Sequence, residues 1–342
     1  MSPPDIVFHP TVTMRKYHDG DALPFGWTAE CAVQELSYLL PDTRIALGTI
    51  AEFEAERFKD VRVMLTGIAP REILATVPKV EWIQFSGSGA DHFFKASKLS
   101  PDDYRRMGIT ILNSPGISKY PVAEHALAMM LALARGLPRA VRQQSRREWA
   151  IFSAGEMRRK TLGIIGLGEI GERVASLARA FGMHVVGCKR RPDIHDGNAH
   201  RVVGIDKMGE VIASSDYLLL LTPLSQETAG LFTYDTFRSM KRSAFFINVS
   251  RGENVNEDDL VCALRDSLIA GAAVDTFGPL ALDDPKKLEA LSPTSKLWDL
   301  PNMLVIPNNA ASSEYYMEYF AEAVADNYRR WRSGKPFRSV AA

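Results

Sequence analysis

The stretch KTLGIIGLGEIGERVASLARAFGMHVVGCKRR, residues 160–191, decides the fold of this chain. It begins with a short apolar segment, which predicts a strand. A turn that contains three glycines follows, and after it apolar residues recur at helical spacing as far as Gly182. A second apolar segment, residues 184–188, predicts the next strand. Strand, tight turn, helix and strand form the setting in which a G-x-G-x-x-G sequence binds a dinucleotide.

Each glycine of the turn has its own expected task. Gly166 permits the tight turn, Gly168 lets the backbone approach a pyrophosphate, and Gly171 lets the helix pack closely on the strand. Glu169 and Ile170 lie where that helix begins, and its N-terminus offers free N–H groups to phosphate. These residues predict a nucleotide site, with an ordinary glycine-rich turn as the alternative.

The end of the second strand indicates which nucleotide is bound. An NAD site usually carries Asp or Glu about 20 residues past the glycines, where it holds the ribose 2′-hydroxyl. This chain has Lys189, Arg190 and Arg191 there. Three cations suit a 2′-phosphate, so we predict NADP(H) as the cofactor and NAD as the weaker alternative. The other interpretation is a solvated basic turn.

Composition excludes several classes of protein. The 342 residues are enough for two domains, and 41 basic residues balance 41 acidic ones, which indicates neither a nucleic-acid partner nor a membrane partner. Cys31, Cys188 and Cys262 are too scattered for a metal site and fit a reducing cytoplasm. The N-terminus lacks the features of a signal peptide, and the densest apolar run, residues 126–134, is too short to span a bilayer. We therefore expect a cytoplasmic protein without metal.

Residues 5–113 alternate short strands with helices, which predicts a parallel sheet covered on both faces. The predicted strands are residues 5–8, 44–47, 61–65, 80–85 and 110–112, and the helices are 29–40, 51–58, 70–76 and 101–107. The fourth strand runs into small residues that include Ser88 and Gly89. Exposed backbone N–H groups at such a strand end can bind a carboxylate. An ordinary turn is the alternative.

A helix predicted over residues 121–135 is apolar nearly all round, which is typical of a helix buried between domains or subunits. Arginines follow it, and a solvated helix face is the favoured interpretation over a binding patch. They are Arg135, Arg139, Arg142, Arg146 and Arg147.

The second half of the chain resumes the alternation, with strands predicted over residues 217–221, 245–249, 271–274 and 304–306 and a last helix over 313–331. Ligands bind where the strands of such a sheet end. The residues that we assign to the cofactor at these ends are Thr222, Pro223, Val249, Asp275 and Asn308.

Four motifs together resemble the D-isomer-specific 2-hydroxyacid dehydrogenase family. They are Asn113-Ser-Pro-Gly with Val122-Ala-Glu-His125, the glycine turn 166–171, Ile247-Asn-Val-Ser-Arg-Gly252, and Gly271-Ala-Ala-Val-Asp-Thr-Phe277. The resemblance implies an α/β fold of two Rossmann-like, doubly wound parallel-sheet domains with a cleft between them. It implies a flavodoxin-like substrate domain, residues 1–117 and 310–342, and an NAD(P)-binding Rossmann domain, residues 118–309. It also implies a homodimer built around the nucleotide domains.

The resemblance also implies roles for single residues. Family enzymes reduce a 2-keto acid by hydride transfer from the nicotinamide, and Arg251 matches the arginine that binds the substrate. Ser88 and Gly89 would offer amides to the substrate carboxylate, and Asp275 would face the nicotinamide end. The family's proton donor, a histidine tuned by a glutamate, is missing, because Asn308 and Leu280 occupy those two positions.

The loss of both residues removes the dyad as a unit, since an amide has no titratable proton near neutral pH. Spacing after residue 277 departs from the family pattern, so Asp283 or Asp284 is a possible substitute for the glutamate. Other groups that stand near the expected cleft by motif position are candidates for the proton donor, each with a structural role as the alternative. They are His92, Lys119, Tyr120 and Tyr315.

Three functions fit this sequence. The favoured one is an NADP(H)-dependent oxidoreductase that acts on a small 2-keto acid, with Arg251 and Asn308 as catalytic residues and another group or water as the proton donor. The second is hydride transfer to an imine or a polarised alkene, which needs no such dyad. The third is a nucleotide-binding pseudoenzyme that acts as a sensor.

Overall fold

The protein is described here as a computed structural model, which covers residues 4–9, 29–193, 197–278 and 291–341. It divides into two compact units. Unit 1 consists of Met1–Ser118 and Ser312–Ala342, and unit 2 consists of Lys119–Ala311. The chain therefore leaves unit 1 once and returns to it once. The two crossing points lie one and two residues from the boundaries expected from the sequence.

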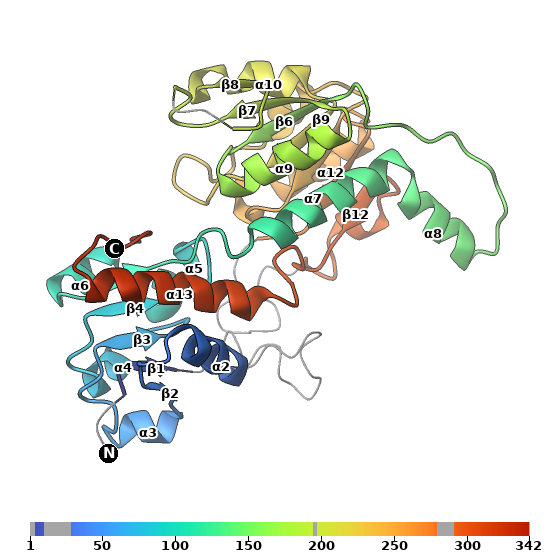
Figure 1. Ribbon diagram of the computed structural model, residues 1–342. Coiled ribbons are helices and arrows are strands. Elements are labelled where there is room, and N and C mark those ends of the chain that lie inside the picture. The colour runs from blue at the N-terminus through green and yellow to red at the C-terminus, as the bar shows by residue number, and fades with distance from the viewer. Residues whose placement is uncertain (1–3, 10–28, 194–196, 279–290, 342) are drawn as a thin grey trace. The chain divides into compact units, whose positions relative to one another are not determined.

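Unit 1 is built on a five-stranded sheet in which every strand pair is parallel. The strands are β1 (Ile6–Phe8), β2 (Ile45–Leu47), β3 (Val63–Leu65), β4 (Trp82–Gln84) and β5 (Thr110–Leu112). They lie in the order β2-β1-β3-β4-β5 (Figure 1). This is the flavodoxin-like order of a doubly wound sheet, which confirms the predicted fold of this part.

Alternate residues of these strands enter two separate cores, because side chains along a strand point to opposite faces. Ile6 and Val63 pack with α2 (Ala29–Leu39) and α13 (Tyr316–Arg332), while Val7 and Met64 pack on the other face. That other face is covered by α3 (Ile50–Glu54), α4 (Arg71–Thr76), α5 (Asp91–Ser97) and α6 (Pro101–Arg106). Helix α13 comes from the far end of the sequence and lies beside α2 (Figure 1).

Unit 2 contains a seven-stranded, wholly parallel sheet. The strands are β6 (Thr161–Ile165), β7 (His184–Cys188), β8 (Arg201–Val203), β9 (Tyr217–Leu220), β10 (Phe245–Asn248), β11 (Gly271–Val274) and β12 (Met303–Val305). Their order, β12-β11-β10-β9-β6-β7-β8, is the Rossmann order with one added edge strand. The direction of winding changes between β6 and β9, which is the place where doubly wound sheets bind ligands.

Helices cover both faces of this sheet. One core holds α7 (Lys119–Ala134) and α9 (Glu169–Ala180), and the other holds α10 (Met208–Ser214), α11 (Tyr234–Arg238) and α12 (Glu257–Arg265). Short 3₁₀ turns complete the unit: Ile205–Lys207, Gly252–Asn254 and Lys296–Asp299. Helix α7 is the apolar helix expected from the sequence, and seven of its 16 residues are buried, in a core that it shares with α9 and strands β10 and β11.

Helix α8 (Leu137–Ser145) has no buried residue and stands away from the sheet of unit 2 (Figure 1). The segment that follows it exposes Trp149 and Ile151, which are 96% and 92% accessible. The guanidinium of Arg139 lies over the Phe152 ring, and that of Arg142 donates to the carbonyl oxygen of Pro301. Helix α8 and the segment after it, residues 137–152, are called the arm of unit 2 below. Exposed apolar side chains such as those of the arm are typical of a surface that binds another protein.

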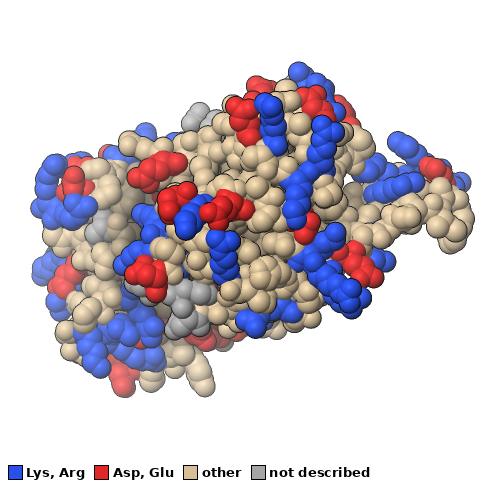
Figure 2. All heavy atoms as spheres, turned by 90° about the horizontal axis from the view of Figure 1, so that it is seen from above, with Lys and Arg blue, Asp and Glu red and all other residues tan. Residues whose placement is uncertain are grey.

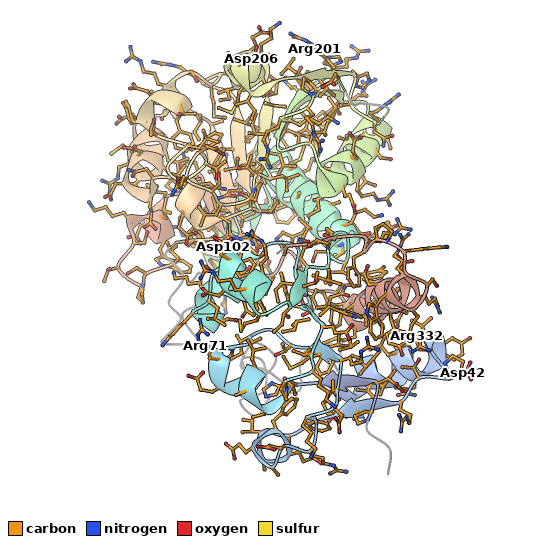
Figure 3. The ribbon with its side chains drawn as sticks, turned by 90° about the vertical axis from the view of Figure 1, so that its left-hand side faces the viewer. Asp42, Arg71, Asp102, Arg201, Asp206 and Arg332 are labelled. Carbon is orange, nitrogen blue, oxygen red and sulfur yellow. The ribbon has the colours of Figure 1, made fainter. Side chains whose placement is uncertain are left out.

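Most charged side chains of the described residues are at least partly exposed, with Asp275 as a buried exception. In unit 2, Arg201 and Asp206 point away from the sheet, and in unit 1 Arg71 and Asp102 do the same (Figure 3). The face drawn in Figure 2 mixes acidic and basic groups. Within the described part of the chain, no helix has the length and apolar content to cross a membrane.

Candidate functional site

The glycine turn after β6 has a steric reason for two of its glycines. Gly166 has a φ of +101°, and a Cβ atom there would lie 2.7 Å from the carbonyl carbon of Leu221. A Cβ on Gly171 would lie 3.1 Å from the carbonyl oxygen of Gly166, so the helix approaches the turn closely. The N–H groups of Gly166 and Leu167 both donate to Cys188, at 3.0 and 3.1 Å, which fixes the turn on β7.

Gly168, in contrast, faces open space. No atom lies within 4 Å of a Cβ built on it, and it is the N-cap residue of α9 without a side chain that caps the helix. The helix therefore begins with amide groups directed outward beside an exposed glycine, with Glu169 and Ile170 in its first turn. This arrangement fits a pyrophosphate, which binds to free N–H groups and the positive end of a helix dipole.

Lys189, Arg190 and Arg191 follow β7 directly. The backbone N–H of Lys189 donates to Val203 at 3.1 Å, and the side chains of Arg190 and Arg191 are exposed. No acidic residue stands at these three positions to accept a ribose hydroxyl. Guanidinium groups bind phosphate bidentately, so this strand end fits a cofactor with a 2′-phosphate.

A buried amide network joins the ends of β9 and β10. The Asn254 side chain donates to the Thr222 carbonyl oxygen at 3.0 Å and to the Ser250 hydroxyl at 3.3 Å. The Asn248 side chain accepts from the N–H and hydroxyl of Ser250 and donates to the carbonyl oxygen of Arg251 at 3.0 Å. Because both amides are fully buried, the backbone beside Thr222 and Arg251 is held firmly.

Arg251 is half-buried, and its Nη1 donates to the Ser250 carbonyl oxygen at 2.8 Å. The next residue, Gly252, lies so close to the following loop that a Cβ there would stand 2.1 Å from the Gly278 nitrogen. The loops after β10 and β11 are therefore packed on each other. The missing dyad was expected to involve position 280, with two nearby carboxylates as substitutes for the glutamate. These residues, Leu280, Asp283 and Asp284, lie outside the described residues.

Asp275, directly after β11, organises the turn that carries Asn308. Its carboxylate accepts from Asn309 N at 2.8 Å and from Ala310 N at 3.0 Å, and its carbonyl oxygen accepts from Asn308 N at 2.9 Å. Asn308 adopts a left-handed φ of +52°. His125, on α7, places Nε2 at 3.4 Å from Asp275 Oδ1. The position expected to hold an acid therefore has an asparagine, in a turn whose next two backbone amides are bound by a buried carboxylate.

The predicted cofactor residues of unit 2, together with the predicted substrate residue Arg251, thus follow the carboxyl ends of its strands in two groups. The glycine turn and Lys189–Arg191 follow β6 and β7, on one side of the point where the winding changes. The other group, Thr222, Pro223, Val249, Arg251, Asp275 and Asn308, follows β9 to β12. A dinucleotide that crosses this point has one end over each group.

In unit 1, hydrogen bonds from other segments fix the loop after β4. The Asn113 side chain donates to the Ser88 carbonyl oxygen at 2.7 Å, and Ser114 N donates to Gly87 at 2.8 Å. Tyr316, on α13, donates its hydroxyl to the Ser86 carbonyl oxygen. Ser88 is exposed and Gly89 is partly exposed, so their amides lie on a fixed loop at a strand's carboxyl end.

The four side chains considered as proton donors differ in their surroundings. Lys119 Nζ lies 4.8 Å from the Tyr120 ring centroid, at the start of α7. His92 Nε2 lies 3.2 Å from Asp91, in unit 1. The negative charge of Glu314 raises the pKa of Tyr315, which makes this phenol a poorer acid at neutral pH. Of these four side chains, Lys119 and Tyr120 belong to unit 2, and Lys119 is the cation of that pair.

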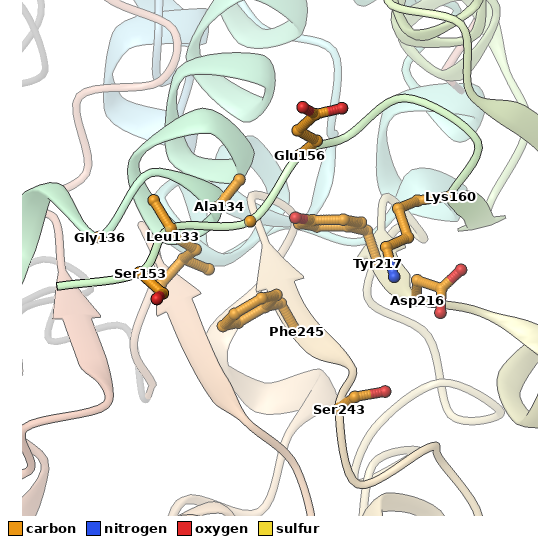
Figure 4. Close-up of a pocket in the computed structure, with 12 residues that line it drawn as sticks. Leu133, Ala134, Gly136, Ser153, Glu156, Lys160, Asp216, Tyr217, Ser243 and Phe245 are labelled. Carbon is orange, nitrogen blue, oxygen red and sulfur yellow. The ribbon is translucent and has the colours of Figure 1, made fainter.

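A surface pocket of about 260 Å³ lies at the opposite, amino-terminal edge of the unit 2 sheet (Figure 4). The rings of Tyr217 and Phe245 form a wall, and burial raises the pKa of Tyr217 to about 12. Burial by itself raises the pKa of Asp216, but hydrogen bonds from Thr161 N and Lys241 outweigh it and lower that pKa. This pocket is remote from the strand ends that carry the glycine turn, Arg251 and Asp275.

Sequence reasoning missed two residues of the site. Asn254 lies three residues past Arg251, and its polar side chain beside an apolar strand was a usable signal. His125 was noted only as part of a motif, because nothing in the sequence connects it with Asp275, which lies 150 positions later. Among the described residues no cluster of three His, Cys, Asp or Glu side chains is arranged to hold a metal ion.

A family model, D-isomer specific 2-hydroxyacid dehydrogenase, NAD binding domain, matches residues 127–310, more than half of the chain. A D-3-phosphoglycerate dehydrogenase of Synechocystis is 35% identical over 241 residues, which cover 69% of this chain and 41% of that protein. A glyoxylate reductase of Korarchaeum cryptofilum is 29% identical over 291 residues, 82% of either chain. The chain spans about half the length of the D-3-phosphoglycerate dehydrogenases that it resembles, 41% of the one from Synechocystis and 55% of one from Methanocaldococcus jannaschii.

Solved structures share the fold. A D-isomer specific 2-hydroxyacid dehydrogenase from Xanthobacter autotrophicus, in complex with NADPH, has a TM-score of 0.76 at 24% identity and covers all of this chain and 98% of its own. An acyclic imino acid reductase in complex with NADPH and D-Arg has a TM-score of 0.72 at 23% identity, over 98% and 99% of the two chains. These likenesses show the fold, and the family model together with the glycine turn identifies unit 2 as an NAD(P)-binding domain. The chain belongs to the D-isomer-specific 2-hydroxyacid dehydrogenase family.

Proposed function

We propose that the chain is an NADP(H)-dependent reductase of small 2-keto acids. The observation that supports this most is the fixed position of Arg251. The buried Asn248 side chain donates to the carbonyl oxygen of Arg251, and the buried Asn254 side chain binds Thr222 and Ser250 beside it. Arg251 therefore follows β10 at the same sheet edge as the glycine turn and Asp275. A binding arginine, a phosphate-binding turn and a buried carboxylate at one edge fit hydride transfer to a bound carboxylic acid.

The cofactor, when bound, supplies a hydride from its nicotinamide ring. The amides at the start of α9 bind its pyrophosphate, and Arg190 and Arg191 bind the 2′-phosphate that distinguishes NADP(H) from NAD(H). The absence of an acidic side chain at positions 189–191 supports the phosphorylated form. NAD(H) is the weaker alternative.

Substrate binding is assigned to Arg251 and to the loop of Ser88 and Gly89. The planar guanidinium of Arg251 accommodates a carboxylate and an adjacent carbonyl oxygen in one plane, which orients the carbonyl carbon and polarises its bond. The amides of Ser88 and Gly89 are proposed to bind the carboxylate. Glyoxylate and hydroxypyruvate are the smallest members of this substrate class and are the first to test.

The proton must come from a group other than a histidine at position 308. The Asn308 amide donates a hydrogen bond to the developing alkoxide, but it has no proton to transfer near neutral pH. Water or the Lys119 ammonium then delivers the proton. We therefore expect the rate of keto-acid reduction to lack the titration of a single imidazole acid.

The same residues favour one second candidate, the reduction of an imine. A protonated imine already carries the proton that a keto acid has to receive, so an amide at position 308 is no handicap. The chain resembles in fold an enzyme of that kind. A third possibility, a nucleotide-binding sensor, predicts tight NADPH binding without turnover of any keto acid or imine.

Oxidation of NADPH by the purified chain separates these functions. The substrates are glyoxylate, hydroxypyruvate and phenylpyruvate, each with and without methylamine. Turnover without amine that Arg251→Ala abolishes supports keto-acid reduction, and turnover only with amine supports imine reduction. If NADPH binds but is oxidised neither with nor without methylamine, the result contradicts both reductase functions and favours the sensor. A matched control, Arg242→Ala, removes an exposed arginine outside the site.

We also propose that the chain forms a homodimer through the arm of unit 2. Helix α8 buries none of its residues, and Trp149 and Ile151 expose almost their whole side chains. A second copy of the chain is the partner that removes this apolar surface from water in every molecule at once. Sedimentation of the double variant Trp149→Ser, Ile151→Ser should shift from dimer to monomer, and an unchanged dimer contradicts this interface.

A further inference from the structure

Asp275 is a buried carboxylate whose charge is only partly balanced. Its side chain is 1% exposed, and the described donors to it are the backbone amides of Asn309 and Ala310. A buried carboxylate is costly unless hydrogen bonds and an opposite charge compensate it. The side chain that supplies a possible opposite charge is His125, whose Nε2 lies 3.4 Å from Asp275 Oδ1.

The elements packed against α7 bring few other charges to this imidazole. Strand β10 contains no ionisable side chain and is followed by Arg251, which donates to Ser250. Helix α9 contributes Arg173, whose guanidinium lies 5.3 Å from the Tyr120 ring centroid at the start of α7. On α7 itself Glu124 is exposed, and α8 meets α7 at its far end.

Among the described residues, Asp275 is thus the sole carboxylate within ion-pair distance of His125. The pair carries one negative charge when the imidazole is neutral and no net charge when it is protonated. Imidazoles ordinarily change charge near pH 6.5, inside the working range of most proteins.

Asp275 follows β11, on the opposite side of the switch point from Lys189–Arg191. A dinucleotide whose 2′-phosphate binds Arg190 and Arg191 therefore has its nicotinamide end on the Asp275 side. The oxidised nicotinamide ring carries a positive charge, and the reduced ring is neutral. A net negative charge beside the ring stabilises the oxidised form relative to the reduced one.

We infer that His125 acts through Asp275 as a positioning residue that sets the relative affinity for oxidised and reduced cofactor. With a neutral imidazole, the pair attracts NADP⁺. With a protonated imidazole, that attraction is lost and NADPH is favoured. This inference rests on the proposed cofactor site, and it makes the balance between the two cofactor forms dependent on pH.

Equilibrium binding tests it. Dissociation constants for NADP⁺ and NADPH are measured at about pH 6 and about pH 8.5, on either side of ordinary imidazole titration. The ratio of the NADP⁺ constant to the NADPH constant should fall by roughly three- to tenfold as the pH rises, the size expected for one partly screened charge. Titration of the 2′-phosphate cancels in this ratio because both cofactors carry that group.

Variants identify the group responsible. His125→Gln is neutral at every pH, so its ratio should stay at the wild-type value for pH 8.5. Asp275→Asn should raise the ratio at pH 8.5, because the attracting charge is gone. The control His184→Gln removes the exposed histidine that begins β7, on the other side of the switch point, and should keep the wild-type pH dependence. If His125 had a structural role alone, its substitution would change the thermal stability or shift the two dissociation constants together. It would not remove the pH dependence of their ratio.

A His125→Gln protein whose ratio still changes with pH overturns the inference, as does a wild-type ratio that is independent of pH. Asp275→Asn weakens the hydrogen bonds that hold the Asn308 turn. If the Asp275→Asn protein does not fold, the result for His125→Gln alone tests the inference. Failure of the proposed cofactor site has a different outcome, because then neither cofactor binds at any pH, and failure of keto-acid reduction alone is read from turnover and leaves both binding constants measurable.

Discussion

Gly166 lies directly against Leu221, so that a Cβ atom on the glycine would stand 2.7 Å from the Leu221 carbonyl carbon. Two loops that follow neighbouring strands, β6 and β9, therefore meet without space for a side chain. Two residues later, Gly168 has no atom within 4 Å of the same position. Gly166 is thus required for packing, and Gly168 for access of a ligand. Substitution of each glycine distinguishes these two roles.

Gly166→Ala should lower the free energy of unfolding by about 1–3 kcal/mol or more, because alanine is strained at a φ of +101° and contacts Leu221. Gly168→Ala should change it by less than about 0.5 kcal/mol, yet weaken NADPH binding, because its methyl group occupies the space a pyrophosphate approaches. Thermal melts and NADPH titrations of both variants check this. Equal melting temperatures would contradict the steric assignment.

The basic end of β7 predicts a selective loss of NADPH. The double variant Arg190→Ala, Arg191→Ala removes charge-assisted hydrogen bonds to the 2′-phosphate, each worth about 1.5–3 kcal/mol. NADPH binding should fall by at least roughly tenfold while NADH binding stays nearly constant. Arg201→Ala, which removes another exposed arginine of unit 2, is the matched control. An equal loss for both cofactors would make this segment a solvated turn.

Restoring the family's dyad tests the assignment of Asn308. Leu280→Glu with Asn308→His introduces an imidazole acid and a carboxylate to raise its pKa, and general acid catalysis typically contributes about 10²–10⁴-fold. Keto-acid reduction should rise, and its rate should acquire a limb that titrates near neutral pH. The single variant Asn308→His controls for the imidazole alone. No gain in either variant would show that the native protein uses another acid efficiently or a different substrate.

Asp216 predicts a pH-dependent contribution to stability. Its pKa is lowered, because the bonds from Thr161 N and Lys241 outweigh the effect of burial. Its contribution, about 1 kcal/mol, is therefore full above the unfolded-state pKa near 3.9 and is lost as the pH falls through the folded-state value. The difference in unfolding free energy between wild type and Asp216→Asn, measured with denaturant, should be full at pH 6 and should shrink as the pH falls below about 3.9. A difference that is as large at every acidic pH at which the protein still folds would exclude this linkage, and Lys241→Met should behave similarly.

The three thiols should differ in their reaction with an alkylating reagent. Burial, and then the nearby charge of Asp206, raises the pKa of Cys188 to about 11, and that side chain is 2% exposed. Cys31 and Cys262 are exposed. At pH 8 those two should react in the folded protein, and Cys188 should react only after unfolding, since the thiolate is the nucleophile. Fast modification of all three thiols, read by mass spectrometry, would contradict the buried position of β7.

The sequence predicted strands most reliably where an apolar run ends at glycines or polar residues. Residues 184–188 and 271–274 became β7 and β11 with the predicted bounds. Parallel pairing followed from their alternation with helices. The edge strand β8 was missed, because three residues without a clear apolar run carry little periodic signal. Helix α5 was missed too, since its adjacent phenylalanines obscure the helical period until Phe93 is seen stacked on Phe85.

The candidate site shows the same division. Gly166, Arg251 and Asp275 were found because strand ends and motifs identify them from local sequence. The contact of His125 with Asp275 and the bond from Asn254 to Thr222 were not, because each joins segments brought together only by the folded sheet. Local sequence predicts which residues reach the sheet edge, and tertiary structure decides which of them touch.

The left-handed backbone at Asn308 has a consequence for how this protein can evolve. At a φ of +52° most side chains are strained, while glycine, asparagine, aspartate and histidine are tolerated best. Codons for asparagine and histidine differ by a single base. One point mutation can therefore exchange a neutral amide for an imidazole acid here without a change in the backbone of the loop. The chemistry of this position can thus change during evolution while the fold around it stays the same.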